Sequence, residues 1–223
     1  YTKGKFTVGV RHESYLNALK DFDPRYNGNG IPYRFAQYNN DGLEITAGSF
    51  YEQFGSGLIL RSYEEKTLGI DNAMDGIRLR YSPISGVYLK TFIGRQRHFF
   101  EYSNGIVRGV DGEVNINDIL KLTTKTKALL GGSVVSRFQN ATNPNFNLPE
   151  NVAAFAGRIN VLSGGLNWYS EYAYKINDPI GSLIENNYAS GNAITSNLTY
   201  SQKGIGVSLE VHTGEVLVII GPS

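Results

Sequence analysis

The sequence predicts an all-β protein: an antiparallel, up-and-down transmembrane β-barrel, or a fragment of a larger one, of roughly 10–12 strands. Three observations predict it. Apolar and polar residues alternate with a period of two along most of the 223 residues, and helical periodicity is almost absent. Turn-forming residues recur between the alternating segments. Short turns also alternate with longer loops, which is typical of outer-membrane barrels.

The composition is compatible with a single domain of this class. The formal net charge of +1 argues against a nucleic-acid partner, because such proteins carry a clustered basic face. Cysteine is absent, so the chain offers no disulfide and no thiolate. No window approaches eighteen consecutive apolar residues, which excludes a transmembrane helix. Strand-like sequence begins at Tyr1, so we expect the numbering to start at a mature terminus or, as we favour, inside a longer protein.

The strands follow one another with clear boundaries. Residues 39–42 read Asn-Asn-Asp-Gly, which tolerate positive φ and predict a hairpin turn. Residues 82–85 and 163–165 are further short turns, whereas residues 139–150 and 176–192 are polar loops. The alternating segments predict strands at residues 6–10, 31–36, 43–54, 77–81, 87–94, 110–116, 125–138, 152–162, 166–175, 194–201 and 205–211.

One side of each predicted strand is apolar, and the other side carries charged residues. On residues 166–175 we expect Leu166, Trp168, Tyr172 and Tyr174 to face lipid, because successive strand side chains point to opposite faces. A soluble sandwich shows the same alternation, so the period alone leaves both classes open. Tyrosines near strand ends would suit an interfacial girdle: Tyr33, Tyr38, Tyr81, Tyr88, Tyr172 and Tyr200. The candidate lumen-facing residues are Arg78, Arg80, Lys90, Glu113, Lys125, Lys127, Glu171 and Lys175.

Residues 48–81 differ from the other segments. The triplet Gly55-Ser56-Gly57 precedes three consecutive apolar residues, 58–60, and a charged run, 61–66. Glycines there let the backbone bend or approach another element closely. We expect this stretch to form a constriction inside the barrel or to bury itself against a partner subunit, with local ion pairs anchoring its far end. Its candidate structural residues are Gly55, Gly57, Arg61, Glu64 and Glu65.

The run FYEQFGSGLILRSYEEKTLGIDNAMDGIRLRYSP resembles a family of Bacteroidota outer-membrane β-barrel proteins whose function is not established. The similarity extends more weakly across residues 1–210. The resemblance implies a fold and a place, the bacterial outer membrane, rather than a reaction. Because of this resemblance, we favour the membrane barrel over the soluble alternative.

The end of the chain follows another pattern. Residues 216–220 are apolar on both faces, and residues 212–223 resemble the strand before the phosphate-binding loop of ABC-transporter ATPases. The lysine and the hydroxyl that hold nucleotide and magnesium in that family do not follow, so we expect no nucleotide binding. We therefore divide the chain into a barrel domain, residues 1–211, and an atypical tail, residues 212–223. A chance apolar strand and a junction with unrelated sequence both explain the tail, and we favour the junction.

No constellation of residues predicts catalysis. His12, His98 and His212 lack metal-ligand spacing, and the sequence predicts no catalytic, cofactor-binding or metal-binding residue. The leading hypothesis is a non-enzymatic outer-membrane barrel, acting as a passive channel or as a structural or accessory subunit of an envelope complex. Its expected partners are outer-membrane lipid and other envelope proteins. The alternative is a soluble all-β module that binds a ligand such as a glycan through Trp168 and Tyr172. An outer-membrane barrel enzyme is the third possibility.

Overall fold

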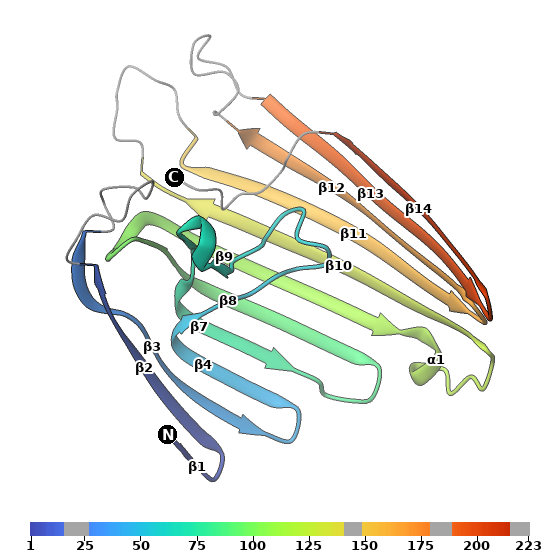
Figure 1. Ribbon diagram of the computed structural model, residues 1–223, viewed down its shortest axis with the longest axis horizontal. Coiled ribbons are helices and arrows are strands. Elements are labelled where there is room, and N and C mark those ends of the chain that lie inside the picture. The colour runs from blue at the N-terminus through green and yellow to red at the C-terminus, as the bar shows by residue number, and fades with distance from the viewer. Residues whose placement is uncertain (16–26, 141–148, 179–188, 215–223) are drawn as a thin grey trace.

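The computed structural model describes residues 1–15, 27–140, 149–178 and 189–214, and it confirms the all-β, antiparallel prediction. Twelve strands form one sheet in which neighbours in sequence are neighbours in space (Figure 1). Along the sheet these are β1 (Thr2–Lys3), β2 (Phe6–Tyr15), β3 (Gly28–Asn40), β4 (Leu43–Phe50), β7 (Met74–Tyr81), β8 (Val87–His98), β9 (Glu101–Asn115), β10 (Thr126–Phe138), β11 (Asn151–Ser163), β12 (Leu166–Asp178), β13 (Ala189–Gln202) and β14 (Ile205–Gly214).

The sheet is open. Within the described residues β14 pairs only with β13, so the twelve strands form a curved wall and not the closed barrel that was one of the two expected forms. Outside the wall lie a two-stranded sheet, β5 (Glu64–Glu65) with β6 (Ile70–Asp71), the 3₁₀ turn η2 (Lys66–Leu68) and the short helix α1 (Ile116–Ile119). None of the described helices has the length and hydropathy of a membrane-spanning helix.

The connections differ in length at the two ends of the sheet, as predicted. At the short-turn end the strands are joined by residues 41–42, 82–86, 164–165 and 203–204, and by the longer segment 116–125, which contains α1. The predicted hairpin at 41–42 is confirmed, with Asp41 and Gly42 both at positive φ. At the long-connection end the joining segments are residues 16–27, 51–73, 139–150 and 179–188, with 99–100 as the short exception.

The strands are inclined to the line of short turns. Tyr81, the last residue of β7, lies on the same cross-strand row as Ile194 of β13, six strand spacings away. Ile194 stands eight residues before Gln202, where β13 ends. The displacement along the strand is eight residues of about 3.4 Å each, and the displacement across the sheet is six spacings of about 4.8 Å each. With the short turns at one level, the strands are inclined by about 40°. Strands in barrels tilt by about 35–45°.

The two faces of the sheet are unlike. We call the face covered by residues 51–73 the inner face and the opposite one the outer face. Exposed large apolar side chains occur on the outer positions of nearly every strand, among them Val8, Ile45, Ile77, Ile93, Val110, Leu130, Phe155, Trp168, Tyr172, Leu198 and Leu209. The buried polar side chains lie mostly on the inner face, for example Thr46, Arg78, Asp111, Ser133, Glu171, Lys175 and Thr195.

Residues 51–73, which we call the insertion, leave the sheet after β4 and return at β7. Phe54, Ile59 and Leu60 of the insertion are fully buried against inner-face side chains of the wall, including Phe92 and Val107. The rings of Phe54 and Phe92 meet edge to face at 5.7 Å. Their packing uses the space above Gly109, where an added Cβ would lie 2.4 Å from Phe92 and 2.7 Å from Phe54. The hydrophobic core is therefore the contact between the insertion and the wall.

The wall curls around the insertion (Figure 1). Three strands separate β2 from β8, so a flat sheet would hold these two about 19 Å apart, which is farther than two side chains reach. Yet Arg97 Nη2 of β8 lies 2.7 Å from Glu13 Oε2 of β2.

Many boundaries differ from the predicted ones: β2, β3, β7, β8, β9 and β13 all extend beyond the predicted ranges. Three further differences concern the insertion, α1 and the end of the sheet. The strand expected at 43–54 ends at Phe50, because the chain leaves the sheet there as the insertion. Ile116, expected in a strand, begins α1, which Asn115 caps by accepting a hydrogen bond from Asn117 N–H. β14 continues to Gly214, past the domain boundary expected after residue 211, and residues 215–223 of the expected tail lie outside the described residues.

Candidate functional site: the inner face and its cavity

The first cluster on the inner face surrounds Glu52 at the base of the insertion. The Glu52 side chain is almost fully buried, and its oxygens lie 2.9 Å from Arg80 Nη2 and 3.2 Å from Lys90 Nζ. Arg78, also buried, pairs with Glu44 at 2.7 Å and donates to the Tyr51 carbonyl at 2.8 Å. Three of the six basic residues predicted for a lumen thus hold the insertion to β7 and β8, with their charges compensated.

A second cluster joins β9 to β11. Arg158 Nη1 lies 2.7 Å from Asp111 Oδ1, and its Nη2 lies 3.1 Å from Asp111 Oδ2, so the contact is bidentate. Arg158 Nε donates to Glu113 at 3.1 Å, and the Ser133 hydroxyl donates to Asp111 at 2.6 Å. Charge-assisted bidentate pairs fix geometry well, so this cluster orients the side chains of three neighbouring strands.

The tip of the insertion touches β12. Glu171 is fully buried and accepts hydrogen bonds from the Ser56 N–H at 2.7 Å and the Tyr169 hydroxyl at 2.5 Å. Gly55 has a φ of +52°, and an added Cβ there would lie 2.5 Å from both Glu171 carboxylate oxygens. Gly57 has a φ of +98°. Both glycines therefore permit backbone geometry that L side chains rarely adopt, and Gly55 also permits a close approach.

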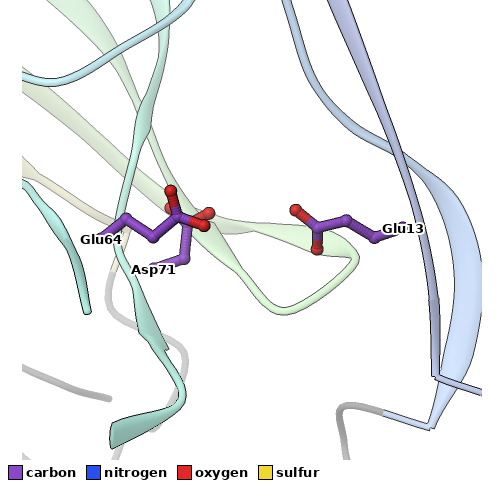
Figure 2. A group of neighbouring side chains, drawn as sticks. All are labelled: Glu13, Glu64 and Asp71. Carbon is purple, nitrogen blue, oxygen red and sulfur yellow. The ribbon is translucent and has the colours of Figure 1, made fainter. Parts of the chain in front are cut away.

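The third cluster fastens the far side of the insertion to β2 and β8. Figure 2 shows Glu13 of β2 directed toward Glu64 and Asp71 of the insertion. Arg11 lies 2.6 Å from Glu13, 2.9 Å from Glu64 and 2.5 Å from Asp71, while Arg97 pairs with Glu13 and with Asp71. The three carboxylates come close enough for a metal ion, but two guanidinium groups already supply the positive charge there. The arrangement is an ion-pair network.

Tyrosines line this network. Tyr51 donates its hydroxyl to Asp71 at 3.1 Å and stacks on Tyr33 at a centroid distance of 5.4 Å. Burial, with a smaller contribution from the Asp71 charge, raises the pKa of Tyr51, so the phenol stays neutral at ordinary pH. The girdle prediction is therefore wrong for Tyr33, which faces the insertion, and for Tyr88, which lines the cavity described next.

A cavity of about 860 Å³ lies between the insertion and the inner face. Its walls come from residues 51–53, 55, 56 and 62 of the insertion and from β7, β8, β9, β11 and β12. The charged side chains on its surface are Glu52, Arg80, Lys90, Asp111, Glu113 and Arg158. Tyr88 and Glu113 lie within three residues of the ends of β8 and β9, so the cavity is nearer the short-turn end.

The remaining predicted residues are dispersed. Lys125 precedes β10, and Lys127 lies at its beginning, and both are exposed at the short-turn end. Lys175 is buried on β12. In the charged run of the insertion, Arg61 lies over the Tyr63 ring at 4.7 Å and Glu65 caps η2 by accepting from Thr67 N–H.

The local ion pairs expected for this run are only partly present. Glu64 lies 4.0 Å from Lys66, but its closer partner is Arg11 on β2. Sequence reasoning did not single out Glu52, Asp111, Arg158 or Arg11. It considered Arg97 only as part of a basic cluster with Arg95 and His98 at a pore mouth or at a solvated strand end, whereas Arg97 is buried and paired with Glu13 and Asp71. Inner-face parity on the strands was a usable signal for Asp111, Arg158 and Arg11. It was not one for Glu52, which lies in the insertion, or for Arg97, which follows a bulge in β8. Their partners were not readable, because each pair joins elements far apart in sequence.

Comparison with known proteins gives one match. Residues 1–219 match a family of unknown function (DUF6029), and the matched range extends past residue 210. No curated protein and no solved structure matches the chain.

Proposed function

We propose that this chain, which belongs to the DUF6029 family of unknown function, forms the wall of a bacterial outer-membrane β-barrel. Its role there is that of a structural or accessory protein of the envelope, without enzymatic activity. The outer face contacts lipid, and the insertion occupies the lumen. The resemblance of residues 50–83 to barrels of Bacteroidota supports the same location.

One observation carries the proposal: the polarity of the two faces is the reverse of that in a soluble protein. The uncovered face presents aliphatic and aromatic side chains, among them Ile93, Val110 and Trp168, whereas the covered face is rich in charges. A soluble sandwich buries its apolar face against a second layer. Between Leu166 and Ile176 the outer positions of β12 extend about 34 Å along the strand. At an inclination of 40° this is a height of about 26 Å, close to the apolar band of about 25 Å in membrane barrels.

The occupied inner face favours a structural role over a wide channel. Porin-like lumens are polar and filled with water. Here the side chains of Arg78, Glu171 and Lys175 are buried, and the insertion packs an apolar core against the wall. Solute passage would have to go around or displace the insertion.

Lipid contact can be tested with Trp168, the only tryptophan of the chain. It is 38% exposed on the outer face, so nitroxide-labelled acyl chains in liposomes should quench its fluorescence strongly. The matched control is the Trp168→Phe/Tyr88→Trp variant, which moves the fluorophore to the cavity on the inner face. That variant should be protected from the lipid quencher.

Equal quenching of both variants, or of neither, would contradict the assigned faces. A second readout is migration on detergent gels before and after boiling, since closed membrane barrels resist unfolding until boiled. The soluble glycan-binding alternative predicts a monodisperse protein without detergent and no quenching by acyl-chain nitroxides.

A further inference from the structure

We propose that the inner-face cavity binds a neutral, hydroxyl-rich ligand of the oligosaccharide class. The cavity is within the range of about 300–1,000 Å³ that ligand pockets span. The proposal concerns a binding activity of the cavity and does not depend on the membrane location. Only the side from which the ligand arrives depends on it.

The charges of the cavity favour an uncharged ligand. Its surface carries three carboxylates and three cations, so its formal net charge is zero. Glu52 is already paired with Arg80 and Lys90, and Asp111 with Arg158. An ionic ligand would have to displace a partner from one of these pairs and leave a buried charge uncompensated, which is costly.

The pairs nevertheless leave hydrogen-bonding capacity at the surface of the cavity. The Lys90 ammonium has three donors, of which two are directed to Glu52 Oε1 and the Gln53 carbonyl. Glu113 accepts from Arg158 Nε and its side chain is about one-third exposed, so its carboxylate can accept further bonds. Lys90 and Glu113 thus offer a donor and an acceptor within one site. A sugar hydroxyl both donates and accepts, so it can satisfy both kinds of group at once.

The aromatic side chains of the cavity add an apolar surface to these hydrogen-bonding groups. Tyr88 is 45% exposed, and Tyr51 and Tyr169 also line the cavity. An exposed ring on an otherwise polar face offers an apolar surface with a polar hydroxyl at its end. The C–H face of a pyranose ring fits such a surface, whereas a simple polyamine or a phosphate does not use it.

The position of the cavity gives the direction of approach. It lies near the short-turn end, and the insertion with its Arg11–Arg97 network covers the inner face toward the other end. Short turns of outer-membrane barrels are periplasmic. If the proposed membrane function holds, the ligand therefore reaches the cavity from the periplasm.

The test is titration calorimetry of the purified protein in detergent with defined probes. These are maltotetraose and chitotetraose as neutral tetrasaccharides, and tetragalacturonate as an anionic one of equal length. We expect at least one neutral probe to bind saturably and tetragalacturonate to bind at least about tenfold more weakly, which corresponds to about 1.4 kcal/mol. Saturable binding without any response to lipid quenchers would leave this inference standing while the membrane proposal fails.

Single substitutions test whether the ligand binds in the cavity. Tyr88→Ala should weaken it about tenfold, Tyr88→Phe should retain it because the ring remains, and Glu113→Gln should weaken it several-fold. Tyr172→Ala, which removes an exposed outer-face ring, should leave it unchanged. The inference is overturned by absence of binding for both neutral probes, by preference for tetragalacturonate, or by equal loss in Tyr172→Ala and Tyr88→Ala.

Discussion

Ser56 and Glu171, which are 115 positions apart in the sequence, are joined by a hydrogen bond of 2.7 Å from the Ser56 N–H to the Glu171 carboxylate. The bond fixes the tip of the insertion on β12, six strands along the sheet from β4, where the insertion begins. Together with the Glu52 and Arg11–Arg97 clusters it makes three separate attachments. These attachments hold the insertion in a fixed position on the wall. Its removal should therefore affect the wall as well as the insertion itself.

The first prediction concerns the close approach at this tip. Gly55→Ala should destabilise the protein more than Gly164→Ala, by about 1–3 kcal/mol, because the new methyl group overlaps the Glu171 carboxylate. Gly164 has a similar φ of +58° but open space around it, so it measures the cost of the backbone conformation alone. Urea unfolding followed by Trp168 fluorescence gives both values. Equal losses would show that the contact with Glu171 contributes nothing.

The second prediction concerns Arg97. It is only 3% exposed, and Arg97→Met leaves Glu13 and Asp71 with one guanidinium fewer, so we expect a loss of about 3–5 kcal/mol. Arg95→Met, two residues away and exposed, should change the free energy of unfolding by less than about 0.5 kcal/mol. Combining Arg97→Met with Glu13→Gln should recover part of the loss. Purely additive effects in this cycle would exclude a coupled pair.

The third prediction separates the two faces. Leu198→Arg places a charge on the outer face, four residues from the end of β13, and should cost about 2–4 kcal/mol in a bilayer. Leu89→Arg lies two residues from the beginning of β8, near the interface, and should cost less. Asn197→Arg, adjacent to Leu198 but on the inner face, is the control and should be tolerated. Folding yields into liposomes measure all three, and equal sensitivity at 197 and 198 would refute the assignment.

The fourth prediction concerns a residue expected from the sequence to face the lumen. Lys90→Leu removes one of the cations that compensate the buried Glu52 carboxylate, so we expect a loss of about 1–3 kcal/mol. Lys127→Leu, an exposed lysine at the short-turn end, should be neutral within about 0.5 kcal/mol. Chemical denaturation in detergent compares them. If the two variants are equally stable, the Glu52 cluster is not a structural attachment.

The fifth prediction concerns the insertion as a whole. Replacing residues 55–66 by a short Gly-Ser linker removes the Ser56–Glu171 bond, the Ile59 and Leu60 core contacts and the Glu64–Arg11 pair. Single-channel recordings in planar bilayers should then show a larger conductance than the unmodified protein. A replacement within residues 120–123, which are exposed at the short-turn end, should leave conductance unchanged. An unaltered conductance after removal of residues 55–66 would mean that the insertion does not obstruct a path.

The sequence was sufficient for the strands and their faces, because period-two alternation is a local signal. The predicted strand at 152–162 differs by one residue at each end from β11, and on β12 the alternation correctly separated Tyr172 and Tyr174 from Glu171. The sequence was insufficient to predict which side chains pair with one another on the inner face. The charged residues Arg78 and Lys90 were expected on one face, but nothing local shows that Glu52 compensates them.

The same limit explains the aromatic residues. A position near a strand end was the basis of the girdle prediction for Tyr33 and Tyr38, but β3 spans Gly28–Asn40, so Tyr33 lies near its middle. A bulge between Arg11 and Glu13 shifts the register with β3, and Tyr33 stacks on Tyr51 of the insertion. Such a contact depends on the path of a segment that leaves the sheet. Alternation along a strand cannot predict the path of such a segment.

The strand directions have one consequence for the edges of the wall. Eleven strands of the sheet are longer than two residues, and each connection reverses the direction, so β2 and β14 both point toward the long-connection end. A seam of β14 on β2, within one chain or between two copies of equal orientation, would be parallel in a sheet whose other ladders are all antiparallel. An antiparallel seam requires an odd number of intervening strands. β1, antiparallel to β2 through Thr2 and Lys3, already lies where the first of these would run.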